Sequence, residues 1–331
     1  MTCYHPITAI YPAVPDQDGK RRLSFSGFPK YDDSPIMRDY LDYSIIKGFR
    51  IHVPCGRCIG CRLDYSRHWA IRSMHEAKMH DKNCFVTLTF NNEHLPDDGS
   101  VHKSYIKSWL KRFRYKYGEN IRYLLCGEYG SKRMRPHYHI LFFGFDFPDK
   151  YIYSVRRGNI YYRSPGLEEI WRDPHATESN GFSIIGEVNF ETSAYVSRYI
   201  TKKIFGAEAQ KKYEGREPEF QLMSRMPGLG YDFLQKYYTD MFNTGFVVID
   251  NLSGHKFKAP IPRYYVDKMK DINEDVYNRY KLDRLQYLYD NLCVDNIDES
   301  TERLLAREEL KNLKLDKLVR IYEMDDFVHN I

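Results

Sequence analysis

The chain has 331 residues and a net charge of +5, but from Asp290 onward 11 acidic residues accompany 6 lysines and arginines, so the preceding part carries about +10 and can meet phosphates, unless its charges form a solvated face. No run of about 18 uninterrupted apolar residues occurs and the first residues lack the layout of a signal peptide, which excludes a membrane span and export and predicts a cytoplasmic protein. Seven cysteines, an odd number, favour a reducing compartment over a disulfide scaffold.

Residues 1–62 are predicted to form an N-terminal arm that ends in a metal-binding knuckle. Up to about residue 50 the arm is rich in Pro, Gly, Asp and Tyr and has little periodicity, which is typical of irregular chain with short strands. Cys55, Cys58 and Cys61 then follow at equal spacing, and intervening glycines permit a tight backbone. This spacing predicts a structural zinc site, with three unligated thiols as the alternative.

The fourth ligand of this knuckle is not adjacent in the sequence. An iron–sulfur cluster is less favoured, because the Cys-Pro continuation of a ferredoxin motif is absent. Cys3 is the first candidate, because it would tie the arm to the knuckle. The alternatives are His5, His52 and Cys84.

Residues 63–205 are predicted to form the core domain. A helix is expected from Asp64 to about Asp81, followed by a buried strand from Asn83 to Phe90 that carries paired threonines, and by a helix from about Ser104 to Tyr117. Near the start of this second helix and along it, one stripe is basic and could contact DNA phosphates. It consists of Lys103, Lys107 and Lys111.

A β-hairpin is predicted next. Its first strand, 121–126, leads to Glu128, and its second begins near Arg135 and carries His137 and His139. Alternate strand residues share a face, so both imidazoles point the same way and can grip one cation. The hairpin can bring Glu128 opposite them. The loop between the strands is basic and is a second candidate for DNA contact, through Lys132, Arg133 and Arg135.

An insertion with weak strands is expected over 146–182, and a strand over 183–190 precedes a helix that Thr192 or Ser193 can cap. At helical spacing Tyr195, Tyr199 and Lys202 form one stripe. We expect a separate apolar stripe to face the core. It consists of Val196, Ile200 and Ile204.

Residues 206–331 are predicted to form a C-terminal extension. A polar stretch comes first, then a helix over 231–242, a hairpin over 245–258 and long charged helices, the last from Thr301 to about Glu323. That last helix has Leu310, Leu313, Leu318 and Tyr322 in partial amphipathic register. No phosphate-cradling GxxxxGK motif occurs, which excludes a recognisable ATP motor.

These side chains together suit phosphodiester chemistry. His137, His139 and Glu128 would hold Mg²⁺ or Mn²⁺, of which Mn²⁺ better suits imidazole, and the bound cation would polarise a phosphate oxygen. Tyr195 and Tyr199 would act as nucleophiles, each helped by Lys202 or Lys203 to lose its proton. Attack on phosphorus links the strand to tyrosine and conserves the bond energy, so that the strand can be rejoined without ATP. An aromatic pair packed in the core is the alternative for the two tyrosines.

Three stretches carry a family resemblance, namely 85–90, 135–139 and 195–203. They resemble the motifs of HUH rolling-circle replication initiators, and stretches 55–62, 126–130 and 228–231 further resemble the replication-associated proteins of gokushovirus-like microviruses, small single-stranded DNA phages. The resemblance implies an α+β fold, the HUH endonuclease fold, with a central antiparallel five-stranded sheet flanked by helices. It also implies an enzyme that nicks the phage origin through a 5′-phosphotyrosine and rejoins the strand.

The same resemblance implies that the protein acts in the host cell cytoplasm on single-stranded and origin DNA, beside a host helicase and polymerase. Two alternatives differ from this interpretation. An HUH transposase or a relaxase shares the chemistry but acts on another substrate. A non-catalytic, zinc-stabilised nucleic-acid binding protein would use the histidines structurally.

Overall fold

A computed structural model describes residues 3–11, 17, 22–25, 49–130, 133–156, 158–202, 213–250, 254–291 and 300–316. Contacts within the chain divide these residues into a larger unit, residues 66–272, and a smaller unit made of residues up to 65 and from 273 onward. Within the described ranges, no helix is both long enough and apolar enough to cross a lipid bilayer.

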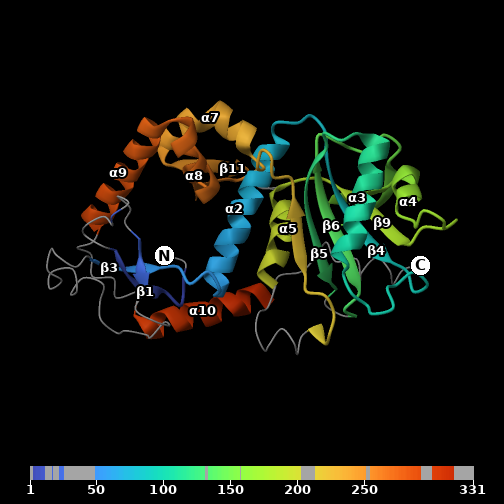
Figure 1. The fold of residues 1–331 in the computed structure, drawn as a ribbon, viewed down its shortest axis with the longest axis horizontal. Helices are drawn as coiled ribbons and strands as arrows, with labels where there is room; N and C mark the ends of the chain where they lie inside the picture. Colours follow the sequence, from blue (N-terminus) through green and yellow to red (C-terminus); the bar gives the residue numbers. More distant parts are fainter. Residues whose placement is uncertain are drawn as a thin grey trace. The chain divides into compact units, whose positions relative to one another are not determined.

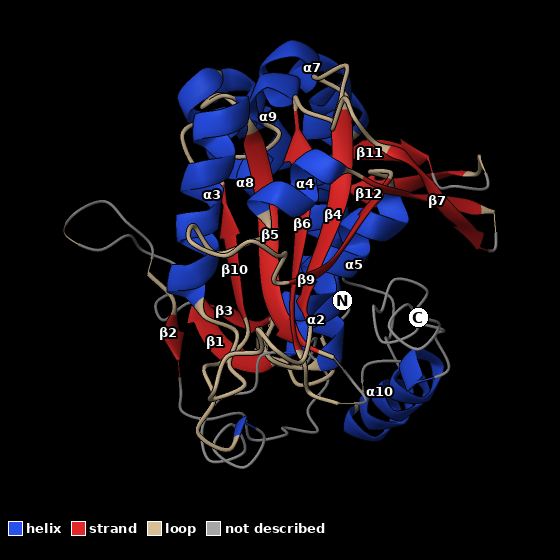
Figure 2. Ribbon diagram, turned by 90° about the vertical axis from the view of Figure 1, so that its right-hand side faces the viewer, coloured by secondary structure: helices blue, strands red, loops and turns tan. Residues whose placement is uncertain are grey.

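The larger unit is built on one antiparallel sheet. Its central strands are β5 (Arg122–Tyr129), β6 (Pro136–Phe143), β4 (Asn83–Phe90) and β9 (Gly181–Gly186), in that order (Figure 2). These strands are rich in β-branched and aromatic residues, and both faces of β4 and β6 are almost entirely buried. The expected α+β class with a large antiparallel sheet is therefore confirmed.

The expectation of five strands is wrong, because the described residues contribute seven strands to this sheet. At one edge the predicted insertion forms β7 (Tyr151–Arg156) and β8 (Asn159–Arg163), and Tyr162 of β8 lies opposite Ile185 of β9. At the other edge β10 (Phe220–Met223) pairs with β5. Strand edges carry unpaired backbone groups, so short segments of weak strand propensity can pair there.

Two helices cover opposite faces of the sheet. On β6, Tyr138 and Phe142 point into the hydrophobic cluster that contains Trp109 of α3 (Lys103–Tyr117). Leu141 and its alternate neighbours point into a second cluster that contains Val196 of α5 (Phe190–Lys202). The helices accordingly lie on different sides of the sheet in Figure 1. The short helix α4 (Pro165–Ile170) adds Leu167 and Ile170 to the α3 side.

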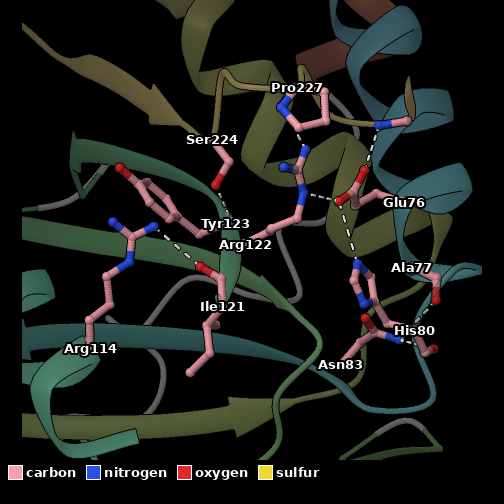
Figure 3. Close-up of polar contacts among 11 residues, drawn as sticks. Glu76, Ala77, His80, Asn83, Arg114, Ile121, Arg122, Tyr123, Ser224 and Pro227 are labelled. Carbon is pink, nitrogen blue, oxygen red and sulfur yellow. Dashed lines mark hydrogen bonds and ion pairs between the residues drawn. The ribbon is translucent and has the colours of Figure 1, made fainter. Parts of the chain in front are cut away.

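Helix α2 (Ile59–Ala77) begins five residues before the predicted start, Asp64, and ends before the predicted Asp81. Its buried Glu76 accepts a hydrogen bond from the Gly230 backbone N–H at 2.6 Å and pairs with Arg122 of β5 (Figure 3). Arg122 also donates to the Pro227 carbonyl at 2.9 Å. Gly230 has φ +79°, and a Cβ there would overlap the Tyr265 hydroxyl, so glycine is required in this loop. The ion pair thus joins α2, the sheet and the 227–230 loop.

After this loop come α7 (Tyr231–Thr244), the hairpin of β11 (Phe246–Asp250) and β12 (Lys256–Pro260), and α8 (Arg263–Ile272). The predicted helix and hairpin are therefore confirmed, with slightly different ends.

The smaller unit has a sheet of β2 (Ser24–Phe25), β1 (Ile7–Tyr11) and β3 (Phe49–Val53), with helices α9 (Glu274–Asn291) and α10 (Thr301–Asp316). The expected short strands and charged helices are confirmed. On α10, Leu304 is buried, whereas Leu310 and Leu313 are exposed, so the predicted apolar register does not mark the buried side of this helix. Leu318 and Tyr322 lie outside the described residues.

His102 connects the start of α3 to the segment before β10. Its Nδ1 lies 3.0 Å from a Glu217 carboxylate oxygen, and its Nε2 lies 3.0 Å from an Asp98 oxygen. Partial burial favours the neutral ring, but the hydrogen bond to Glu217 and the charge of Asp98 outweigh it and raise the pKa of His102. The protonated imidazole therefore stabilises this connection.

This raised pKa makes a testable prediction for the pH dependence of stability. The contribution of His102 is complete below the unfolded-state pKa of about 6.5 and is lost as pH rises through the higher folded-state pKa. Between these pH values the free energy of unfolding of the wild type should fall faster than that of His102→Asn, as measured by urea denaturation. His175→Asn, which changes an exposed histidine, is the control and should keep the wild-type slope. Parallel pH profiles for wild type and His102→Asn would contradict the assignment.

Candidate active site and cysteine cluster

Three neighbouring strands present polar side chains on the α5 face of the sheet. The β5–β6 register places Glu128 directly opposite His137, and the β4–β6 register places Thr87 opposite His139. A hydrogen bond from the Gly130 N–H to the Arg135 carbonyl, at 2.9 Å, closes the hairpin and supports this register. The strand alternation that the sequence predicts thus puts a carboxylate, two imidazoles and a hydroxyl side by side.

The imidazole of His139 is held on several sides. Its Nε2 lies 2.7 Å from a Glu128 carboxylate oxygen, and its Nδ1 lies 2.9 Å from the Thr87 hydroxyl. The Phe85 ring stacks on it at 5.9 Å between centroids, and the His137 ring lies 6.2 Å away. Glu128, His137 and His139 are each at most 2% exposed. Two imidazoles and one carboxylate form a donor set that suits a catalytic divalent cation and leaves positions for other ligands.

Tyr195 lies against this group. Its ring meets the His139 ring edge-on, with 5.1 Å between centroids and an interplanar angle of 85°, and its side chain is 4% exposed. The phenol-bearing face of α5 and the imidazoles therefore share one side of the sheet. Tyr195 also belongs to the hydrophobic cluster that contains Val196, so the expected division between a tyrosine stripe and an apolar core stripe is wrong at these two positions.

Helix α5 is positioned by its first residues and by α2. Asn189 is the N-cap, because its side chain accepts from the Thr192 N–H at 2.8 Å while the Thr192 hydroxyl accepts from the Asn189 N–H at 2.9 Å. The prediction that Thr192 or Ser193 is the N-cap is therefore wrong: the strand ends early, at Gly186, which leaves Asn189 to begin the helix. Ser66 of α2 donates to the Ala194 carbonyl at 3.3 Å, so the two helices pack closely.

The other predicted members of the helix are only partly located. Tyr199 and Lys202 lie in α5 by their backbone, but their side chains are not among the described ones, and Lys203 lies outside the described residues. Ile200 is in the same position as Tyr199, and Ile204 in the same position as Lys203. The helical spacing that relates Tyr199 to Tyr195 is present, since α5 continues through Lys202.

The predicted basic residues are not all near the histidines. Lys103, Lys107 and Lys111 are exposed on α3, which covers the opposite face of the sheet. Arg133 is exposed in the hairpin loop, and Lys132 lies outside the described residues. Arg135 donates to the Phe90 carbonyl at 2.8 Å, so this guanidinium ties β6 to the end of β4. The structure therefore brings the hairpin arginines close to the histidine strand but leaves the lysine stripe on the other side.

Cys3, Cys55, Cys58 and Cys61 form a separate cluster in the smaller unit. All four sulfur atoms lie within 4.8 Å of one another, and among the described residues this is the cluster that could hold a metal ion. Backbone N–H groups point at the sulfurs, from Tyr4 to Cys58 and from Cys55 to Cys3, both at 3.3 Å. Four convergent thiols with such donors fit a tetrahedral metal site. Of the four candidates for the fourth position, Cys3 is the one that joins the cluster.

The other three candidates lie elsewhere. His5 contacts Glu308 at 2.5 Å, Cys84 is fully buried in the cluster of the main sheet, and His52 is not part of the thiol group. Within the thiol group, a hydrogen bond between the Cys58 and Cys3 thiols lowers the pKa of Cys58 to about 3, whereas burial raises the pKa of Cys61 to about 12. One sulfur is thus already favoured as the thiolate that metal binding requires.

Two features of the site do not follow from the sequence. The capping role of Asn189 is hidden, because the predicted strand extends too far. The sequence marks Thr87 only as one of two threonines on a strand, because its partner depends on which strand lies beside β4. The signal that could have found it is the side-chain alternation of β4, which puts Thr87 on the same face as the strand partner of His139.

Comparison with known proteins identifies the family. Residues 83–204 match a family model of replication-associated proteins of the ORF2 type. Replication-associated protein VP4 of Bdellovibrio phage phiMH2K is 34% identical over 237 residues, which cover 69% of this chain and 70% of that protein. ORF2 of Spiroplasma virus 4 is 33% identical over 257 residues (73% and 75%), and ORF4 of Chlamydia phage 1 is 29% identical over 244 (70% and 57%). No solved structure matches.

The matched segment contains β4, β5, β6, β9 and α5, and therefore every residue of the group around His139. The chain belongs to the family of microvirus-like replication-associated proteins.

The cysteine cluster leads to a prediction about metal content. We expect the purified protein to hold one zinc ion per chain, and Cys3→Ser or Cys58→Ser to release it, because each change removes one of four ligands. Elemental analysis after gel filtration measures the ratio. Cys84→Ala is the matched control, since Cys84 is buried but lies outside the cluster. A Cys3→Ser protein that keeps its full metal content would contradict the assignment, and iron in place of zinc would correct its identity.

Proposed function

We propose that this chain is a site-specific DNA nickase and strand transferase that starts and finishes rolling-circle replication of a small circular phage genome. The observation that carries the proposal is the edge-on contact of Tyr195 with His139, whose Nε2 is 2.7 Å from Glu128. A phenol beside an imidazole–carboxylate pair is an arrangement suited to phosphoryl transfer. Membership in the family of replication-associated proteins supports the biological role.

His137, His139 and Glu128 would hold the divalent cation of this reaction. Their neighbouring positions on β5 and β6, and the short distance between Glu128 and His139, fit a group of ligands that converge on one ion. When bound, Mg²⁺ or Mn²⁺ would neutralise charge on a non-bridging phosphate oxygen, an effect on the order of several kcal/mol. The three side chains do the positioning, since each is buried and constrained by packing.

Tyr195 supplies the nucleophile in this proposal. Its phenol loses a proton, its oxygen bonds to phosphorus, and the bond from phosphorus to the 3′ oxygen breaks, which leaves a free 3′ hydroxyl and a 5′-phosphotyrosine. Reversal by a 3′ hydroxyl rejoins the strand. Tyr199, one helical turn further along α5, would make a second attack while the first tyrosine is still linked, with Lys202 and Lys203 favouring the phenolate.

DNA contact is proposed for two sets of basic residues. Arg133 and Arg135 would meet the strand near the histidines, with Lys132 beside them. A longer path around the sheet would be needed to include Lys103, Lys107 and Lys111, because α3 covers the other face. Tyr195 is 4% exposed, so this face must open before a phosphodiester can reach its oxygen.

The wider organisation follows the same proposal. Residues 1–62 would form the arm with a zinc-stabilised knuckle, 63–205 the HUH endonuclease core with the insertion 146–182, and 206–331 the extension. The protein would act in the host cytoplasm beside a host helicase and polymerase. An HUH transposase or relaxase would carry the same site, and a nick at a phage origin rather than at a transposon end or transfer origin separates them.

The covalent step gives the most specific prediction of this proposal. The double variant Tyr195→Phe, Tyr199→Phe should form no covalent adduct with labelled single-stranded origin DNA, because both phenol oxygens are gone while both rings remain. Adduct is measured as labelled protein on a denaturing gel with Mn²⁺ present. Tyr115→Phe, which changes a tyrosine that is 95% exposed on α3, is the control and should react like the wild type. Adduct formed by the double variant would overturn the proposal.

The cation site gives a separate prediction. His137→Ala and His139→Ala should each lower Mn²⁺-dependent nicking by at least about 100-fold, the upper end of what weakened ligation costs, while DNA affinity changes little. Nicking of a labelled origin strand and DNA binding at fixed salt are measured on the same samples. If both variants nick normally, the histidines are not the ligands. If the wild type holds zinc at the cysteines and no second divalent cation, the non-catalytic alternative is favoured instead.

A further inference from the structure

We propose that Thr87 is a positioning residue, which sets the tautomer of His139 and thereby makes its Nε2 available to a divalent cation. This inference rests on the proposed cation site. It begins from the hydrogen bond of 2.9 Å between the Thr87 hydroxyl and His139 Nδ1. Thr87 is 2% exposed, and the strand register places it between His139 on β6 and Ile184 on β9.

The neutral imidazole ring carries a single proton, and its position decides what the ring can bind. A nitrogen that ligates a cation must be unprotonated, so ligation through Nε2 requires the proton on Nδ1. The Nδ1 proton then needs an acceptor, because a buried donor without one costs about 1–3 kcal/mol. The Thr87 hydroxyl oxygen lies in the position to accept it.

A hydroxyl can serve both states of the ring, because it donates and accepts. Without a cation, Nε2–H donates to Glu128 at 2.7 Å and the Thr87 hydroxyl donates to Nδ1. With a cation, Nδ1–H donates to Thr87, and both Nε2 and the Glu128 carboxylate are released to act as ligands. The proton moves between the two nitrogens through solvent, and the ring keeps its neutral charge. A threonine thus permits the change of tautomer that an apolar side chain would oppose.

The next threonine along the strand is the natural contrast. Thr89 lies opposite His137 in the register and is also fully buried, but its hydroxyl donates to the Pro136 backbone carbonyl at 3.4 Å. Thr89 therefore has the same residue type, strand, face and burial as Thr87 without a bond to an imidazole nitrogen. Loss of the hydroxyl at these two positions should have different consequences.

The experiment measures cation affinity rather than nicking. Mn²⁺ binding to the full-length protein, with zinc already present, is followed by the paramagnetic signal of free Mn²⁺ in titrations of wild type, Thr87→Val, Thr87→Ser and Thr89→Val. Thr87→Val should weaken Mn²⁺ binding by about 10- to 100-fold, as expected for loss of a partner behind a ligand. Thr87→Ser should restore most of the affinity, and Thr89→Val should bind like the wild type. Urea denaturation confirms that each variant is folded.

A spectroscopic measurement follows the tautomer itself. In long-range ¹H–¹⁵N spectra with diamagnetic Mg²⁺, His139, assigned by its absence in His139→Ala, should carry its proton on Nδ1 in the wild type and on Nε2 in Thr87→Val. Thr87→Val that binds Mn²⁺ as tightly as the wild type, or Thr89→Val that loses as much affinity as Thr87→Val, would overturn the role of Thr87. Mn²⁺ binding by the wild type that His139→Ala leaves unchanged would instead overturn the proposed cation site.

Discussion

The register of β4, β5 and β6 is the constraint on which the candidate site depends. A shift of one residue in either pairing would turn every side chain of the shifted strand to the other face and separate Glu128 from His139. The register is held by the hydrophobic faces on both sides of β6, which pack on α3 and on α5, and by the short hairpin that joins β5 to β6. The polar group is therefore built on the most deeply buried strands of the molecule.

The same packing sets where the nucleophile lies. Tyr195 joins the hydrophobic cluster under α5, so the contacts that attach the helix to the sheet also fix its ring against His139. The Asn189–Thr192 cap determines where the helix begins, and Ser66 of α2 holds it from the other side. The Glu76–Arg122 pair and Arg72, which donates to the Leu229 carbonyl at 3.0 Å, attach α2 to the loop that places Leu229 in this cluster. A rigid surround of this kind favours ligands held close to their working geometry.

Much of the site can be predicted from the sequence, because it depends on local periodicity. The alternation of His137 and His139, the helical spacing after Tyr195 and the short hairpin before Arg135 are all local patterns, and the cysteine spacing marks the knuckle in the same way. The pairing of Thr87 with His139 is not local, since it requires knowing that β4 lies beside β6.

The errors have related physical causes. The sequence does not place β7, β8 and β10 in the sheet, because backbone pairing at a sheet edge needs little strand propensity. The lysine stripe of α3 is predicted to meet DNA, but sequence alone does not say which face of the sheet a helix covers. Helix α2 starts early because its first turn includes Cys61 of the knuckle, where tertiary contacts override the low helix propensity of Gly60.

The central claim is that His137, His139 and Glu128 hold a divalent cation beside Tyr195. Anomalous diffraction at the manganese absorption edge, from crystals of the full-length protein soaked in Mn²⁺, tests this claim most directly. The account predicts one manganese peak within coordination distance of all three side chains, on the α5 side of the sheet. A manganese peak at the cysteines alone, or none near the three side chains, would contradict it.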